Sequence, residues 1–186
     1  ISRDGSLCCE EVALADIAAQ TGTPCYVYSS RDVRERFQAY DEALDGMPHL
    51  VCYSVKANSN LALLNLLAKA GAGFDIVSGG ELFRVIQAGG KASRVVFSGV
   101  GKTVEEIEYA LQQGIHSFNC ESEGEFALVD SLAARRGVKA RIALRVNPNV
   151  DAGAHAYVKT GLRQNKFGID ISEAEEAYDR AHACRS

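Results

Sequence analysis

Lys56 is the residue in this sequence with the most evident chemical potential. It follows the apolar run of residues 50–55, and no carboxylate stands beside it in the chain. A lysine that is partly removed from water has a lowered pKa, and its neutral amine can form a Schiff base with a carbonyl group. Buried lysines are rare, so a lysine at this position requires a reason, and a catalytic role is one candidate. The alternative is a lysine that emerges into solvent where the strand ends.

Acidic residues and glycines follow the next apolar segment, residues 73–77. Asp75 lies on this segment, and Gly79, Gly80 and Glu81 stand at the entry of the helix after it. Glycines allow a ligand to approach the backbone closely, and a helix N-terminus favours an anion. Glu81 is therefore either a binding residue or a capping residue in the first turn of that helix.

Two further polar residues, Glu121 and Arg145, stand at or near the ends of later apolar segments. An arginine in such a place can hold a carboxylate or a phosphate, or it can form an ion pair inside the mouth of a barrel. Parallel strands end at the same edge of a sheet, so Lys56, Asp75, Glu121 and Arg145 are predicted to converge on one polar active site.

Two other segments invite a functional interpretation. Residues 98–103 (SGVGKT) end like a phosphate-binding loop, but Val96 stands where that motif requires its first glycine. We interpret them as a loop between a strand and a helix, with Thr103 as the helix cap. Residues 149–168 form a long loop that contains His155, and their length favours a lid or a substrate loop. His155 itself is expected to be solvated.

These residues must be positioned by alternating strands and helices. Hydrophobic periodicity and capping patterns predict helices over residues 12–21, 30–44, 61–69, 80–88, 104–113, 122–136 and 172–183. Strands are predicted over residues 25–28, 50–55, 73–77, 94–97, 116–119 and 139–146. Ser172 and Glu175 form a capping-box pattern at the start of the last helix.

Strands that alternate with helices through short loops indicate an α/β fold with a parallel sheet. The turn after the first buried strand, residues 56–60 (KANSN), lacks the glycines of a dinucleotide-binding fold, which disfavours a doubly wound sheet. A (β/α)8 barrel uses about 31 residues per βα unit. The chain from residue 50 onward is therefore predicted to form only about the first five units of such a barrel.

Composition narrows the possible function classes. The chain has 186 residues and a formal net charge of −4, with no basic run that could bind nucleic acid. No stretch approaches the ~18 consecutive apolar residues of a membrane span. The six cysteines form no regular framework, which favours a reducing cytoplasm, and the four histidines lack the spacing of metal ligands.

Five motifs, taken together, resemble the N-terminal part of the diaminopimelate decarboxylase family, within the pyridoxal-phosphate enzymes of alanine-racemase-like fold (fold type III). They are residues 53–58 (YSVKAN), 74–81 (FDIVSGGE), 118–122 (FNCES), 144–148 (LRVNP) and 160–169 (TGLRQNKFGI). They recur in order across nearly the whole chain. Residues 23–28 (TPCYVY) also look like the lead-in strand of this family.

The resemblance implies a cofactor, a set of site residues and a reaction. Lys56 would form the internal aldimine with pyridoxal 5'-phosphate, and Asp75, Glu81 and Arg145 would belong to the polar network around the cofactor. The reaction would convert meso-2,6-diaminopimelate to L-lysine and CO₂, in a homodimer when the protein is full length. The alternatives are an ornithine- or arginine-type decarboxylase of the same fold and a non-catalytic regulatory relative.

The resemblance also implies that the family carries further site elements beyond residue 168. These are a histidine that stacks on the cofactor, a glycine-rich phosphate loop, an acidic partner of the pyridine nitrogen and a cysteine segment from the dimer partner. His155 precedes that point and is not the stacking histidine. We therefore expect residues 30–186 to be the N-terminal part of the cofactor-binding barrel, inactive alone, and residues 1–29 to belong to a separate β domain.

Overall fold

The computed structural model describes residues 2–3, 5–148, 150 and 167–184. Its centre is a parallel sheet of five strands that pair in the order in which they occur in the chain. Each strand overlaps one predicted from the sequence. The strands are β4 (Cys52–Ser54), β5 (Gly73–Ile76), β6 (Val95–Phe97), β7 (Ser117–Cys120) and β8 (Ile142–Leu144).

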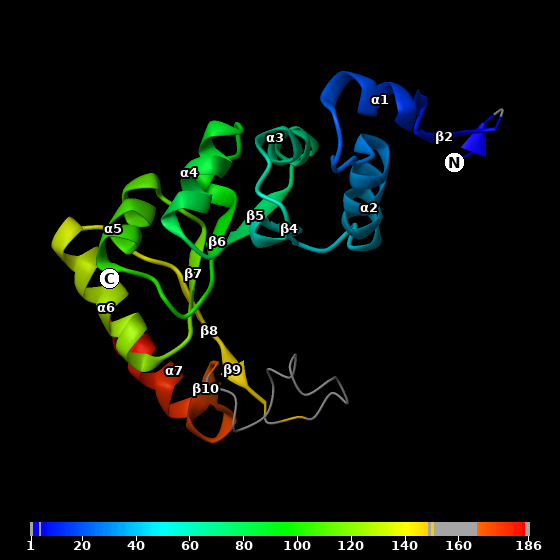
Figure 1. Cartoon of the computed structure of the whole chain (residues 1–186). Helices are drawn as coiled ribbons and strands as arrows, with labels where there is room; N and C mark the ends of the chain where they lie inside the picture. Colours follow the sequence, from blue (N-terminus) through cyan, green and yellow to red (C-terminus); the bar gives the residue numbers. More distant parts are fainter. Residues whose placement is uncertain (1, 4, 149, 151–166, 185–186) are drawn as a thin grey trace.

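Helices that follow the first four of these strands cover one face of the sheet (Figure 1). They are α3 (Leu61–Ala70), α4 (Gly79–Gln87), α5 (Val104–Gln113) and α6 (Glu123–Arg136). Each helix contacts the next one in the series. Short 3-10 turns flank two of the strands: η1 (Val55–Ala57) follows β4, and η2 (Ala92–Arg94) precedes β6. The predicted succession of βα units is therefore confirmed.

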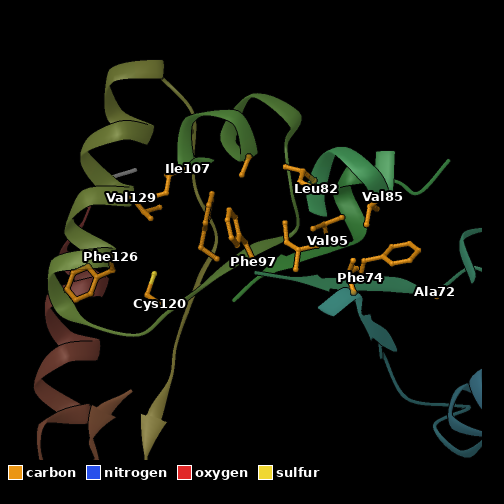
Figure 2. Close-up of a cluster of buried hydrophobic side chains, with 14 of the residues drawn as sticks. Ala72, Phe74, Leu82, Val85, Val95, Phe97, Ile107, Cys120, Phe126 and Val129 are labelled. Carbon is orange, nitrogen blue, oxygen red and sulfur yellow. The ribbon is translucent and has the colours of Figure 1, made fainter. Parts of the chain in front are cut away.

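The two faces of the sheet differ because successive side chains of a strand point to opposite sides. Side chains that point to the helices are at most 1% exposed and belong to the hydrophobic core: Phe74, Ile76, Val95, Phe97, Phe118 and Cys120. Figure 2 labels Phe74, Val95, Phe97 and Cys120 among them. The rings of Phe97 and Phe118 stack with centroids 6.1 Å apart. The alternate positions, which include Asp75, Ser98 and Asn119, are only partly buried.

Three successive helices begin with the same capping pattern. Ser78, Thr103 and Ser122 are the N-caps of α4, α5 and α6, and each side-chain hydroxyl accepts a hydrogen bond from the backbone N–H three residues later. A glutamate occupies that third position in each case, and Thr103 with Glu106 forms a complete capping box. The predicted role of Thr103 as a cap is confirmed.

The chain before the sheet forms small elements. An antiparallel sheet contains β1 (Ser2–Arg3), β2 (Ser6–Cys9) and β3 (Val12–Ala13), and it was not predicted. Helices α1 (Leu14–Thr21) and α2 (Ser30–Ala43) confirm the two helices predicted there, although α1 begins two residues later than expected. Helix α2 packs against α3, and the Ser29 hydroxyl caps it by accepting a hydrogen bond from the Asp32 N–H.

The strand predicted over residues 25–28 is wrong. These residues carry no strand pairing, and Tyr26 and Tyr28 are 91% and 60% exposed. An extended, apolar segment becomes part of a sheet only where another strand accepts its backbone hydrogen bonds. Among the residues that the structure describes, no strand pairs with this segment.

The last part of the chain differs from the prediction in three ways. The strand predicted over residues 139–146 is interrupted at Arg145, so that β8 is followed by a separate β9 (Val146–Asn147). A strand that was not predicted, β10 (Ile169–Asp170), pairs in parallel with β9. The predicted helix is present as the turn η4 (Ile171–Glu173) and the helix α7 (Ala174–Ala183).

The capping box predicted for Ser172 and Glu175 is wrong. Instead, the Asp170 carboxylate accepts a hydrogen bond from the Ser172 N–H at 2.9 Å. Helix α7 continues directly from η4, and its N-cap residue Glu173 already has a helical backbone conformation. A side-chain cap forms where the chain enters a helix from an extended conformation, and that entry lies at Asp170.

Most of the predicted loop over residues 149–168 lies outside the described residues, and so do His155 and residues 160–166. In the part of the chain that the structure describes, no helix is long and apolar enough to cross a membrane.

Candidate active site

A cavity of about 440 Å³ lies at the C-terminal ends of the five parallel strands. This is the edge where parallel barrels carry their catalytic groups. The lining residues come from η1 and from the ends of β5, β6, β7 and β8, and they are Lys56, Asp75, Ser98, Asn119, Glu121, Ala143, Leu144 and Arg145. The four residues that were predicted to converge on one rim, Lys56, Asp75, Glu121 and Arg145, are thus brought together.

Lys56 lies in η1, directly after β4, where the fully buried Val55 anchors the turn in the core. The Lys56 side chain is exposed, so the expectation of a buried lysine is wrong for the described residues. Within the described part of the chain, no hydrogen bond or ion pair engages the Lys56 amino group, which leaves it available to a ligand in the cavity.

Asp75 is held by hydroxyl groups from both neighbouring strands. Its Oδ2 accepts a hydrogen bond from the Ser54 Oγ at 3.3 Å, and its Oδ1 accepts one from the Ser98 Oγ at 2.5 Å. The Asn119 Nδ2 donates in turn to the Ser98 Oγ at 3.0 Å. The result is a chain of hydrogen bonds across four strands that fixes the direction of the Asp75 carboxylate at the cavity.

Arg145 and Glu121, which also line the cavity, form an ion pair. The Arg145 Nη1 donates to both carboxylate oxygens of Glu121, at 3.0 and 3.1 Å. The Glu121 side chain is 5% exposed and the Arg145 side chain 43%. The guanidinium also lies 5.3 Å from the ring centroid of Phe167, within the range of a cation–π contact. Among the described residues, these contacts use one of its nitrogens as donor, so its other N–H groups are candidates for binding an anion.

Glu81 is not among the residues that line this cavity. Its backbone N–H donates to the Ser78 Oγ at 3.2 Å, and its Oε2 accepts a hydrogen bond from the Val77 N–H at 2.8 Å. These bonds are those of the capping alternative. The role of Glu81 near a cofactor stays a prediction.

Ser98 and Asn119 were not singled out as site residues from the sequence. The signal that could have found them is the alternation along the strands, because both stand at positions that point away from the helices, like Asp75. Ser98 was interpreted only as the start of a loop, and Asn119 only as the end of a strand.

Cys120 lies between Asn119 and Glu121 but on the other face of β7, in the hydrophobic core (Figure 2). Burial raises the pKa of the Cys120 thiol to about 12, and the nearby Glu125 carboxylate acts in the same direction. A thiol in this state is not a nucleophile at neutral pH. The cavity therefore offers an amine, carboxylates, a hydroxyl, an amide and a guanidinium as its polar groups.

A comparison with known protein families gives a match to this chain. The family model described as "Pyridoxal-dependent decarboxylase, pyridoxal binding domain" matches residues 30–185, which is most of the chain. The chain belongs to this family. The fold is that of its cofactor-binding barrel, and the five parallel strands correspond to the first βα units, as predicted.

Individual relatives carry a more specific name. The chain is similar to a diaminopimelate decarboxylase from Pseudomonas fluorescens, with 57% identity over 96% of this chain and 43% of the relative. A diaminopimelate decarboxylase from Vibrio cholerae is 55% identical over 97% of this chain and 43% of its own length. The chain thus spans less than half the length of these relatives.

Solved structures agree with these relatives. A diaminopimelate decarboxylase from Helicobacter pylori, complexed with L-lysine, superposes with a TM-score of 0.88 at 44% identity, over 92% of this chain and 43% of that one. The enzyme from M. jannaschii, also in complex with L-lysine, gives a TM-score of 0.89 at 36% identity, over 98% of this chain and 44% of that one.

The family implies pyridoxal phosphate as cofactor, and the residues at the cavity fit part of this group. The Lys56 amine, which no described residue engages, suits its aldehyde, and the Arg145 guanidinium at the cavity suits an anionic group. A volume of about 440 Å³ is within the range of small-molecule sites.

Proposed function

We propose that this chain provides the Lys56 side of the active site of a decarboxylase that converts meso-diaminopimelate to L-lysine and CO₂. The observation that carries the proposal is the convergence of Lys56, Asp75 and Arg145 on one cavity in a chain of the pyridoxal-binding family. Relatives at 55% and 57% identity bear the name of this activity. Two structural neighbours hold L-lysine, the product that the proposal names.

In this proposal the side chains at the cavity have separate tasks. The exposed amino group of Lys56 would hold the cofactor by condensing with its aldehyde, with loss of water. Asp75, oriented by Ser54 and Ser98, keeps a carboxylate facing the cavity. Arg145, fixed by Glu121, offers its remaining N–H groups to an anionic group of the ligand. Pyridoxal phosphate, when bound, supplies the electron sink for the electron pair that remains after CO₂ leaves.

We infer further that residues 1–29 belong to a separate β domain and that residues 30–186 belong to the barrel. Exposed Tyr26 and Tyr28 support this division, because an unpaired apolar segment is suited to pairing with other strands. A homodimer in the cytoplasm is part of the same proposal. Among the described residues the cysteines form no disulfide, which fits a reducing compartment. Sedimentation equilibrium of the full-length protein tests the dimer.

The test uses the full-length protein with pyridoxal phosphate. We expect a visible absorbance band from the bound cofactor, and we expect borohydride reduction to fix the cofactor on the peptide that contains Lys56. Lys56→Ala should abolish the band and lower the rate of CO₂ release by about 10³-fold or more. Lys69→Ala, which removes an exposed lysine from the last turn of α3, is the matched control and should leave both unchanged.

Substrate choice is measured by CO₂ release from meso-diaminopimelate, ornithine and arginine. Faster release from ornithine or arginine would replace diaminopimelate as the substrate, and cofactor binding without any release would indicate a non-catalytic relative. The 186-residue chain alone should release no CO₂, and turnover by that chain would contradict the expectation that it is inactive alone.

A further inference from the structure

Lys102, in the loop between β6 and α5, has a buried side chain. Its side chain is 1% exposed, and the centroid of the Phe97 ring lies 5.4 Å from its Nζ. The loop is the one that resembles a phosphate-binding motif, and the proposed reaction gives it no role. A lysine that is almost fully buried requires partners for its charge and for its three N–H donors.

The Lys102 ammonium uses all three donors within the protein. Its Nζ donates to the Gly99 carbonyl oxygen at 2.7 Å, to the Asn119 carbonyl oxygen at 2.9 Å and to the Glu125 Oε1. It therefore has no donor left for a phosphate. Instead it ties its own loop to the end of β7 and to the first turn of α6.

One series of hydrogen bonds connects the Lys102–Glu125 pair to Arg145. The Glu125 Oε2 accepts a hydrogen bond from the Glu121 backbone N–H at 3.0 Å. Glu121 in turn holds Arg145 with both carboxylate oxygens. The Lys102–Glu125 pair is therefore two contacts away from the guanidinium that lines the cavity.

A second series of hydrogen bonds connects Lys102 to Asp75. Lys102 holds the backbone carbonyl of Asn119, and the Asn119 side chain donates to Ser98, which donates to Asp75. The end of β7 thus presents two side chains to the cavity, Asn119 and Glu121, and the backbone of each is bonded to the Lys102–Glu125 pair.

Stability alone is a weak reason for such a pair. Two charges that leave water lose their hydration, and replacing a buried ion pair by apolar side chains of similar size is often neutral or stabilising. Apolar side chains, however, can neither accept a hydrogen bond from the Glu121 N–H nor donate one to the Asn119 carbonyl oxygen.

We propose that Lys102 is a positioning residue of the cavity, which holds the end of β7 so that Glu121 reaches Arg145 and Asn119 reaches Ser98. This proposal rests on the proposed function for its effect on cofactor binding. Its effect on the end of β7 is independent of that function.

The test compares variants of the full-length protein by two measurements: hydrogen exchange of the Glu121 amide and the dissociation constant of pyridoxal phosphate. Lys102→Met should speed exchange and weaken cofactor binding, each on the order of tenfold, as for other residues that orient a ligand's partners. Val129→Ala, which leaves a cavity at a fully buried position of α6, is the control for a general loss of stability. It should change the exchange rate and the dissociation constant only as far as its lower free energy of unfolding accounts for.

A second variant separates positioning from folding. Lys102→Met combined with Glu125→Met replaces the pair by apolar side chains. Relative to Lys102→Met alone, this double variant should recover much of the melting temperature. Exchange of the Glu121 amide should stay fast, and cofactor binding should stay weak. Recovery of both measurements together with stability would overturn the proposal. If the wild-type protein bound no pyridoxal phosphate, the proposed function would fail, while exchange at Glu121 would still decide the role of Lys102.

Discussion

Cys120 is one residue away from Glu121, yet its thiol faces the helices and not the cavity. The two neighbours show that position in the sequence next to a site does not place a side chain in it. Burial holds the pKa of the Cys120 thiol at about 12, well above its ordinary value. Its reactive thiolate is therefore a very small fraction at pH 8.

This difference predicts a selective labelling pattern. In the native protein at pH 8, Ellman's reagent should modify the exposed Cys25 and leave Cys120 unmodified until the protein is unfolded. Peptide mass spectrometry identifies the modified cysteines, and Cys25→Ser should remove the signal of that residue. Modification of Cys120 at the rate of Cys25 in folded protein would contradict the orientation of β7.

Single residues also show what the sequence could and could not predict. A lysine after an apolar strand indicated the cavity correctly, but the structure exposes Lys56 and buries Lys102. Burial depends on neighbours that are distant in the chain: Lys102 is enclosed by residues 17 and 23 positions away. Hydrophobic periodicity carries no information on such contacts.

Elements were predicted best where a local signal fixes them. The caps at Ser29, Ser78, Thr103 and Ser122 define helix starts in the sequence, and those four helices begin within a residue of the prediction. Two-residue strands such as β3 and β10 have no periodicity to detect, and their existence depends on a partner strand. Residues 25–28 show the opposite: they have the apolar pattern of a strand, but no described strand pairs with them.

Glu10 connects the turn between β2 and β3 to the start of α2, and this connection predicts that the stability of the fold depends on pH. It lies in the turn between β2 and β3, and its Oε1 accepts hydrogen bonds from the Arg31 N–H and from the hydroxyls of Ser29 and Ser30 at the start of α2. The bond from the Arg31 N–H is the main reason that the pKa of Glu10 falls to about 2. The ionised form is thus favoured in the folded protein.

A lowered pKa means that the folded state binds this proton less readily than the unfolded state. Glu10 therefore stabilises the fold fully above about pH 4.5, its ordinary pKa, and the contribution is lost as the pH falls towards 2. The difference in melting temperature between wild type and Glu10→Gln should follow that course. A difference that stayed constant from pH 6 to pH 2 would contradict the hydrogen bonds at the start of α2.

At the scale of the whole molecule, the sheet separates stability from chemistry. Its helix-facing side holds the hydrophobic core, and the other side holds Asp75, Ser98 and Asn119. Predicting parallel βα units from the sequence was enough to place the cavity at the ends of the strands. The hydrogen bonds across the strands could not be predicted, because they depend on the register of neighbouring strands, which the sequence does not specify.

Substitutions on the two faces should accordingly have different effects. Phe118→Ala should lower the free energy of unfolding of the full-length protein by about 3–5 kcal/mol, because it leaves a cavity in the core. Ser98→Ala removes hydrogen bonds at a partly buried position and should cost only about 1 kcal/mol while weakening cofactor binding. Urea unfolding measures the first quantity and cofactor titration the second. An equal loss of unfolding free energy in Phe118→Ala and Ser98→Ala would show that the two faces of the sheet do not separate stability from ligand binding.

The alternation along β5, β6 and β7 also has a consequence for how such an enzyme can change. Every second codon of these strands encodes the scaffold, and the codons between them encode the pocket. Selection for a new ligand can therefore act on Asp75, Ser98 and Asn119 while Phe74, Phe97 and Phe118 keep the fold. A library restricted to the pocket codons should retain folded members at a high frequency, which makes these strands a natural starting point for directed evolution.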